Sequence, residues 1–467
     1  VQAIPNAKAS EWMEENIPLF ECPQHNFEEM YYYRWWSLRK HIKETPVGYG
    51  MTEFLVQRSY SDKYNLIACA IGHHIYESRW LRDPKYLDQI IHTWYRGNDG
   101  GPMKKMDKFS SWNADAVLAR YMVDGDKDYL LDMKKDLETE YQRWERTNRL
   151  KNGLYWQGDV QDGMEESISG GRRKKYARPT INSYMYGNAK ALSCIGILSG
   201  DEGMAMKYGM RADTLKNLVE NELWNTRHQF FETMRTDSSA NVREAIGYIP
   251  WYFNLPDTTQ KYEIAWKEIM DEKGFSAPYG LTTAERRHPE FRTRGVGKCE
   301  WDGAIWPFAS AQTLTAMANF MNNYPQTVLS DSVYFRQMEL YVESQYHRGR
   351  PYIGEYLDEV TGYWLKGDQE RSRYYNHSTF NDLIITGLIG LRPRLDNTIE
   401  VNPLIPADKW DWFCLDNVLY HGHNLTILWD KNGDRYHCGK GLRIFVDGKE
   451  VGHTDTLTKI VCENVLK

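Results

Sequence analysis

Two glutamates in aromatic surroundings are the residues of this sequence best suited to bond chemistry. Glu165 follows a stretch rich in Gln, Asp and Gly, and Glu355 lies about 190 positions later beside Tyr356. Hydrolysis of a glycosidic bond uses such a pair, because one carboxylic acid protonates the leaving oxygen while one carboxylate activates water or attacks carbon. Neighbouring aromatic rings offer flat apolar faces to a sugar, and their polar tips hydrogen-bond to hydroxyl groups. The pair therefore predicts a carbohydrate site.

Four segments combine Trp, Tyr, carboxylates and Gly in what we interpret as loop-like stretches. They are Tyr31–Trp36, Asp162–Ser169, Glu300–Trp306 and Gly354–Thr379. For any one segment, packing or helix capping explains the composition equally well. Four of them between helical blocks favour a single site built from distant parts of the chain.

The blocks between these segments are mostly helical from about residue 55 to 390, with apolar residues at helical spacing. The predicted helices include residues 64–78, 84–91, 127–144, 188–199, 204–224, 310–321 and 333–343. Gly125-Asp126 and Gly200-Asp201 are expected to end one helix and begin the next. Roughly a dozen helices without long alternating strands predict helical hairpins arranged in a ring, an (α/α)6 toroid.

After Pro393 the pattern becomes β-rich, with strands expected at 398–401, 425–429 and 442–446. Asn432-Gly433 and Asp447-Gly448 are turn signals between them. We predict a mainly α protein with three parts: an N-terminal segment 1–30, the toroid 31–392, and a small antiparallel β domain 393–467 packed on the toroid.

Composition excludes several classes of function. The 467 residues carry 58 basic and 64 acidic side chains without a basic stripe, so no nucleic-acid partner is expected. No apolar run of about 18 residues exists, which excludes a membrane-spanning helix. The seven cysteines are scattered and lack metal-ligand spacing, and His73, His74 and Glu77 have no evident third ligand. We expect no metal and no cofactor.

The start of the sequence at Val1 is consistent with a processed chain, so export to the periplasm or the outside of the cell is the expectation, with the cytoplasm as the alternative. Asn376-His377-Ser378 and Asn424-Leu425-Thr426 match the glycosylation pattern. A glycan at Asn376 would obstruct the rim of the expected site, which favours a bacterial source.

The sequence resembles the six-hairpin glycosidases of the clan that includes trehalases, processing α-glucosidases and mannosylglycerate hydrolases (families 37 and 63). Asp162–Ser167 is similar to the clan segment that carries the general acid, an Asp, and Glu165 falls on that Asp. Gly354–Asp358, followed by Thr361-Gly362, is similar to the segment that carries the catalytic base, and Glu355 falls on it.

Two further segments extend the resemblance over residues 30–392. Glu300–Pro307 is similar to the trehalase stretch that lines the sugar subsite, and Tyr375–Asp382 stands where the family has a closing aromatic segment. The sequence departs from the clan in two ways: the acid position carries Glu rather than Asp, and the trehalase arginines are not reproduced. Asp162 and Glu166 therefore stay open as alternative acids, and trehalose is not the expected substrate.

The resemblance implies an inverting mechanism, in which the two carboxyl groups lie roughly 6.5–9.5 Å apart with a water between them. Glu165 is then the protonated general acid and Glu355 the ionised general base of an exo-acting glycoside hydrolase. The expected contacts to the sugar come from aromatic and polar residues of the four segments. They are Arg34, Trp36, Asp162, Trp301, Asp302, Trp306, Tyr375 and His377. For His377, bonding to local backbone groups is an equally good explanation.

Two other functions remain open at this stage. A polysaccharide lyase acting on uronates would need a Tyr or His base and a cationic group, for which Tyr375, His377 and the cluster at Arg172 are candidates. A carbohydrate-binding protein without turnover would release no sugar. The sugar and the linkage are not fixed by the sequence.

Overall fold

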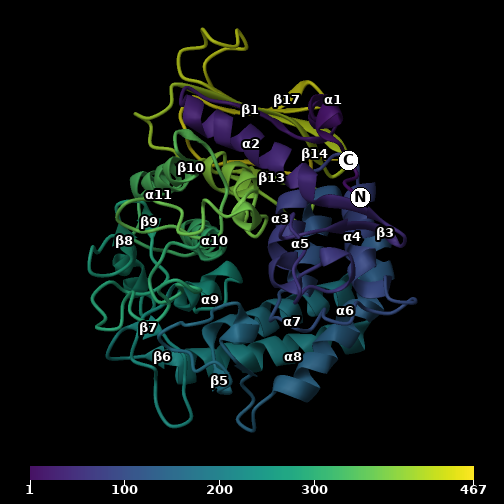
Figure 1. Ribbon diagram of the computed structural model, residues 1–467. Coiled ribbons are helices and arrows are strands. Elements are labelled where there is room, and N and C mark those ends of the chain that lie inside the picture. Colours follow the sequence, from purple (N-terminus) through teal and green to yellow (C-terminus); the bar gives the residue numbers. More distant parts are fainter. Residues whose placement is uncertain (467) are drawn as a thin grey trace.

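The helices of the computed structural model, which describes residues 1–466, form a closed ring (Figure 1). Six inner helices contact one another in sequence order, and the last contacts the first. They are α3 (Ile71–Ser78), α5 (Asn113–Asp124), α7 (Pro179–Ser199), α9 (Ile249–Tyr252), α10 (Pro307–Asn323) and α12 (Asn381–Leu383). The two shortest are extended by the 3-10 helix η6 (Ala245–Tyr248) and the π-helix η9 (Ile384–Leu388). The predicted (α/α)6 toroid is confirmed.

Six further helices alternate with the inner ones along the chain. They are α2 (His25–His41), α4 (Lys85–Arg96), α6 (Lys127–Asn148), α8 (Glu202–Leu218), the 3-10 helix η7 (Glu263–Ile269) and α11 (Asp331–Ser344). The inner helix α7 is buried over most of its length and uses glycines where neighbours come close. A Cβ added at Gly187 would lie 2.2 Å from the Phe253 ring, and one at Gly196 would lie 2.6 Å from the nitrogen of Ala205. Small residues thus allow α7 to touch α8 and α9.

The Gly-Asp steps end and begin helices as predicted. Gly125 and Gly200 follow α5 and α7 in the left-handed conformation, with φ of 71° and 73°. Asp126 accepts a hydrogen bond from the nitrogen of Tyr129, and Asp201 accepts one from that of Met204, so each caps the next helix.

The prediction of a helix over 64–78 is wrong in its first half. Tyr64 and Asn65 have φ of 61° and 64°, and α3 begins only at Ile71. The Asn65 amide donates to the carbonyls of Phe54 and Val56, which holds this stretch as a loop. Apolar spacing alone does not reveal such a side-chain bond to the backbone, which competes with helix formation.

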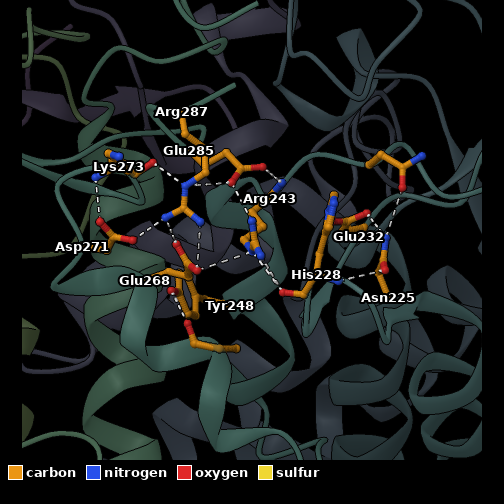
Figure 2. Close-up of polar contacts among 12 residues, drawn as sticks. Asn225, His228, Glu232, Arg243, Tyr248, Glu268, Asp271, Lys273, Glu285 and Arg287 are labelled. Atoms are coloured by element: carbon orange, nitrogen blue, oxygen red, sulfur yellow. Dashed lines mark hydrogen bonds and ion pairs between the residues drawn. The ribbon is translucent and has the colours of Figure 1, made fainter. Parts of the chain in front are cut away.

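Residues 219–306 contain little regular helix, and a network of ion pairs holds them (Figure 2). Arg243 binds Glu285 at 2.7 Å and donates to the carbonyl of His228. Arg287 binds Glu268 at 2.7 Å and Asp271 at 2.5 Å. The network joins four short stretches between Asn225 and Arg287, so ion pairs help to hold this part of the ring, where regular helices are short.

The C-terminal part is antiparallel, as predicted, and the start of the chain joins it. Its main sheet has the order β1-β14-β15-β16-β17, and a second sheet has the order β12-β13-β18. Asp447 and Gly448, both with positive φ, form the tight turn between β16 and β17. The strands are β1 (Leu19–Glu21), β12 (Leu391–Arg392), β13 (Ile399–Val401), β14 (Trp412–Tyr420), β15 (His423–Asp430), β16 (Gly441–Val446), β17 (Lys449–Thr454) and β18 (Ile460–Cys462).

The boundary predicted at residue 31 falls inside α2, and β1 from the segment 1–30 pairs with β14. The remaining elements are short and lie in connections. They are η1 (Asn6–Lys8), α1 (Ala9–Asn16), β2 (Ile42–Thr45), β3 (Gly48–Met51), η2 (Lys63–Asn65), η3 (Ala68–Ala70), β4 (Trp156–Gln157), η4 (Val160–Asp162), β5 (Tyr176–Ala177), η5 (Val219–Leu223), β6 (Trp224–Asn225), β7 (Phe230–Phe231), β8 (Ser276–Ala277), β9 (Gly280–Leu281), β10 (Tyr346–His347), β11 (Arg350–Pro351) and η8 (Glu370–Ser372).

Connections at the two ends of the ring differ in length. The chain passes from an outer to an inner helix through long segments, and from an inner to an outer helix through short ones such as 125–126 and 200–201. The long segments are 42–70, 97–112, 149–178, 219–248, 270–306 and 345–380. Because all six precede an inner helix, they lie at the same end of the ring, where they can build a site.

Among residues 1–466 no helix is long and apolar enough to cross a membrane. The same residues contain no cluster of His, Cys, Asp and Glu that could hold a metal ion, and all seven cysteines are free thiols.

Buried polar side chains tie the last long connection to α3. The Glu77 carboxyl group accepts hydrogen bonds of 2.9–3.2 Å from the nitrogens of Phe380, Asn381 and Asp382. Arg79 completes the tie, because its guanidinium binds the Asp382 carboxylate at 2.8 Å. Glu77 therefore caps α12 from another helix.

We expect Glu77→Gln to lower the free energy of unfolding by about 2–3 kcal/mol, because an amide cannot accept from three buried N–H groups at once. Chemical denaturation measures the change. Glu14→Ala on the exposed face of α1 is the control and should change the free energy by less than about 0.5 kcal/mol. Equal effects of the two substitutions would contradict the capping role.

Candidate active site

A cavity of about 370 Å³ lies among the long connections and contains both predicted carboxyl groups. Five of the six long segments contribute to it. Its lining residues are Glu53, Arg58, Tyr60, Ile67, Cys69, Lys108, Phe109, Val160, Gly163, Glu165, Cys299, Trp301, Trp306, Glu355, Lys366, Arg371 and Tyr375. A pocket of this size with aromatic walls and a few polar groups suits a small ligand.

Another cavity, of about 360 Å³, is lined by Arg79 and Asp382 and by Tyr76 and Asp115. Here each carboxylate already has a partner, since Asp382 binds Arg79 and Asp115 accepts from the Tyr76 hydroxyl at 2.6 Å. The cavity with Glu165 and Glu355 is the better candidate for chemistry, because its carboxyl groups keep hydrogen-bonding capacity.

Glu165 sits in a tight loop that points it into the cavity. Gly163 makes the turn with φ of 73°, and a Cβ there would lie 2.9 Å from the sulfur of Cys69. Trp301 Nε1 donates to Glu165 Oε2 at 3.3 Å. Burial raises the pKa of Glu165 to about 6, although the Trp301 hydrogen bond acts in the opposite direction. This carboxyl group holds its proton more strongly than an exposed glutamate does.

Glu355 has a different environment, because two cations face it. Lys366 Nζ lies 3.8 Å and Arg371 Nη2 lies 3.6 Å from Glu355 Oε2. The side chain is 7% exposed, so these cations compensate a negative charge in a place with little water. His377 Nε2 lies 3.2 Å from the Glu355 carbonyl oxygen and fixes the backbone there.

The two alternative acids have partners outside the cavity. Asp162 forms a fully buried ion pair with Arg178 at 2.8 Å and also accepts from the Thr180 hydroxyl. Glu166 turns the other way, with φ of 66°, and binds the exposed Arg172. Of the three carboxyl groups in this loop, Glu165 is the one that lines the cavity.

Three of the predicted sugar contacts line the cavity: Trp301, Trp306 and Tyr375. The Trp301 and Trp306 rings stack on each other at 4.3 Å, and each is less than 5% exposed. The two stacked rings therefore expose their edges to the cavity more than their faces. Their packing also sets the position of the Trp301 N–H that reaches Glu165.

Arg34, Trp36, Asp302 and His377 do not line this cavity. Tyr31–Trp36 belongs to α2 and is not a loop, which corrects the interpretation of that segment. Arg34 donates to the Ser378 carbonyl at 2.7 Å, and Trp36 stacks on Tyr33.

Asp302 and His377 hold backbone close to the cavity. Asp302 accepts from the nitrogens of Arg294 and Gly295, and this shapes the loop before α10. His377 stays neutral, because burial lowers its pKa well below the usual value. Its contact with the Glu355 carbonyl agrees with the backbone-bonding explanation given above.

Five charged residues of the cavity were missed by the sequence analysis. Glu53, Arg58 and Lys108 come from the connections before α3 and α5, which contain no catalytic-looking motif. Lys366 and Arg371 lie inside the predicted segment 354–379 but were not singled out. Both follow Glu355 closely in the sequence, and this could have identified them, because a buried carboxylate is expected to have cations nearby.

Comparison with known proteins gives two family matches. Residues 63–378 match the model described as "Mannosylglycerate hydrolase MGH1-like glycoside hydrolase domain". Residues 391–453 match the C-terminal domain of glycosyl hydrolase family 65.

The chain is also similar to several solved structures. A protein named as a sialidase is 95% identical over the whole chain, with a TM-score of 0.99, but the chain spans 43% of that protein. The family 63 mannosylglycerate hydrolase of Thermus thermophilus, in complex with Tris, is 12% identical, with a TM-score of 0.57 over 74% of this chain and 98% of its own. The family 78 rhamnosidase of Bacillus sp. GL1 is 11% identical, with a TM-score of 0.62 over 92% of this chain and 41% of its own. These two distant likenesses concern the fold.

The different partners of Asp162 and Glu166 give a test. We expect Asp162→Asn to lower the free energy of unfolding by about 3–5 kcal/mol, because it leaves Arg178 buried without its counter-charge. Glu166→Gln, whose partner Arg172 is exposed, should cost less than about 1 kcal/mol. Denaturant titration of both variants compares them, and a larger loss for Glu166→Gln would refute this arrangement.

Proposed function

The chain belongs to the mannosylglycerate hydrolase MGH1-like glycoside hydrolase family, and we propose that it is an inverting, exo-acting enzyme with Glu165 as general acid and Glu355 as general base. One observation carries this proposal. Two carboxyl groups line the same cavity but have opposite surroundings, one buried beside an indole and the other beside two cations. Such a difference separates an acid from a base on a single scaffold.

The role of Glu165 follows from its raised pKa. A general acid must carry a proton when the substrate binds, and burial favours the neutral carboxylic acid. In the reaction its proton passes to the oxygen of the leaving group. Trp301 then stabilises the carboxylate that remains, because its N–H already reaches Oε2.

The role of Glu355 follows from Lys366 and Arg371. These cations stabilise a carboxylate in a buried place, and a carboxylate can take a proton from water. The water attacks the anomeric carbon on the face opposite to the leaving group, which inverts its configuration. His377 acts at a distance by holding the backbone of Glu355.

The sugar residue would lie between the two carboxyl groups, against Trp301, Trp306 and Tyr375. The volume of about 370 Å³ suits one terminal sugar residue with part of its leaving group, which supports exo action. Arg34, Asp162 and Asp302 are positioning residues in this proposal, since each holds backbone or a buried cation. Trp36 packs against Tyr33 away from the cavity.

The identity of the sugar is open, because similar proteins are named for different substrates. The protein named as a sialidase is more than twice as long as this chain, so its name need not describe this part of it. A substrate panel should therefore contain neutral hexosides, pentosides and deoxyhexosides, a sialoside, and acidic oligosaccharides of plant, host and bacterial origin. Export from a bacterial cell and the absence of a nucleic-acid partner stay predictions.

On a substrate from this panel, we expect Glu165→Gln and Glu355→Gln each to lower kcat/KM by about 10²–10⁴-fold, the usual contribution of a positioned acid or base. Proton NMR of the first-formed sugar should show the anomer opposite to that of the substrate. Glu166→Gln is the matched control and should keep wild-type activity.

Other outcomes identify the rival functions. A retained anomer would reject the inverting mechanism. An unsaturated product that absorbs in the ultraviolet would indicate a lyase. Sugar binding without any release would indicate a binding protein, and Glu165→Gln would then leave the affinity unchanged.

The pH profile gives a further prediction. Because the acid must be protonated, kcat/KM of the wild type should fall as the pH rises through about 6, the pKa of Glu165. Trp301→Phe removes a hydrogen bond that lowers this pKa, so the alkaline limb should move to higher pH. An unmoved or lowered limb would show that Glu165 does not govern it.

A further inference from the structure

Glu53 is a third carboxyl group in the cavity, and the fold holds it firmly. It follows β3, and its backbone carbonyl accepts from the nitrogen of Asn376 at 2.9 Å. The Tyr375 hydroxyl donates to Glu53 Oε1 at 2.6 Å. Phe54 packs edge-on against the Tyr375 ring at 4.4 Å. The side chain is therefore fixed from both the connection before α3 and the connection before α12.

The other oxygen of this group, Oε2, is buried and has no hydrogen-bond partner in the described part of the chain. Buried polar atoms without a partner are uncommon in folded proteins, and those in a site often await a ligand. Glu53 lines the same cavity as Glu165 and Glu355 and is 6% exposed. Glu53 Oε2 is thus available to form a hydrogen bond with a ligand in the cavity.

The charges around Glu53 favour the neutral acid. No cation among residues 1–466 lies within ion-pair distance of it, whereas Lys366 and Arg371 both face Glu355. Burial raises the pKa of Glu53 to about 8, and the carboxyl groups of Glu355 and Glu165 add to the rise, while the Tyr375 hydrogen bond opposes it. The titratable and charged groups that face it or share its cavity are Arg58, Tyr60, Cys69, Lys108, Glu165, Glu355, Lys366, Arg371 and Tyr375.

We propose that Glu53 is a neutral carboxylic acid that binds the substrate, accepting from Tyr375 through Oε1 and donating its own O–H to a hydroxyl or ring oxygen of the sugar. The inference rests on the proposed function, since it needs a sugar between Glu165 and Glu355. Glu53 adds no charge to the reaction. It supplies a donor where an ionised carboxylate would only accept, so the cavity selects an oxygen acceptor at this point of the sugar.

Loss of this proton has a consequence for the pH profile. Above the pKa of Glu165, kcat/KM falls about tenfold per pH unit, because the fraction of enzyme with a protonated Glu165 falls tenfold. When Glu53 also ionises, kcat/KM of the wild type should fall about a hundredfold per pH unit above pH 8, because the active form needs protons on both Glu165 and Glu53.

The test compares Glu53→Gln, Glu53→Ala and Tyr375→Phe with Glu166→Gln as control. Glu53→Gln keeps a neutral donor, so its kcat/KM at pH 6 should fall by no more than about tenfold, and its slope above pH 8 should stay tenfold per unit. Glu53→Ala should lose about 10–100-fold at pH 6 through the lost hydrogen bond, and its slope above pH 8 should also stay tenfold per unit. Tyr375→Phe should move the second limb to higher pH, because the hydrogen bond that lowers the pKa of Glu53 is absent. Glu166→Gln should keep the wild-type slopes.

Two results would overturn the inference. Inactivation of Glu53→Gln to the level of Glu355→Gln would show that Glu53 acts as a carboxylate. Wild-type kinetics and slopes in Glu53→Ala would show that it does not touch the substrate.

A measurement without substrate separates this inference from the proposed function. Infrared difference spectra between wild type and Glu53→Gln should show the C=O band of one protonated carboxyl group at pH 6, lost above about pH 8. Absence of that band would refute the neutral acid even if the enzyme cleaves a substrate. Its presence in a protein that cleaves nothing in the panel would instead reject the proposed hydrolase.

Discussion

The structure depends on the way buried polar side chains hold the connection 374–382 at the centre of the ring. His41, Arg34 and His74 reach the carbonyls of Tyr374, Ser378 and Asn376, respectively. Glu77 and Arg79 bind its end, where α12 begins. An irregular backbone inside a protein must have its hydrogen bonds satisfied, and here side chains from α2 and α3 do so. The constraint closes the ring, because α12 is the helix that links α10 back to α3.

The same constraint builds the cavity. Tyr375 and His377 belong to the anchored connection, and through them it positions two carboxyl groups. Tyr375 holds the side chain of Glu53, and His377 holds the backbone of Glu355. The burial that anchors the chain also surrounds these side chains with protein, which strengthens their electrostatic interactions. Stability and candidate chemistry therefore rely on the same bonds, and a substitution that loosens this connection should affect both.

Much of the fold was predictable from local rules. Glycine at the end of a helix and aspartate at the start of the next act within a few residues, so Gly125-Asp126 and Gly200-Asp201 gave correct boundaries. The loop at Tyr64 and Asn65 was not predictable in this way, since its conformation depends on bonds to residues about ten positions away. The participation of β1 in the C-terminal sheet depends on contacts across almost the whole chain.

The candidate site shows the same division between local and distant information. Glu165 and Glu355 stand out because their aromatic and glycine-rich neighbours are adjacent in the sequence. Glu53 has no such neighbours, and it becomes notable only when Tyr375, more than three hundred residues later, donates to it. Segment 31–36 illustrates the opposite error, since aromatic residues at helical spacing serve packing in α2 as readily as recognition.

Charge placement, rather than residue type, distinguishes the three glutamates of the cavity. All three are the same side chain, and all three are largely removed from water. The cations Lys366 and Arg371 face Glu355, an indole N–H faces Glu165, and a phenol faces Glu53. A carboxyl group near fixed cations is stabilised as an anion, and one that faces only neutral donors pays the full desolvation of its charge. Two cations thus accompany Glu355, whereas burial among neutral donors raises the pKa values of Glu165 and Glu53. This asymmetry arises because the residues around each carboxyl group come from different long connections that meet at one end of the ring.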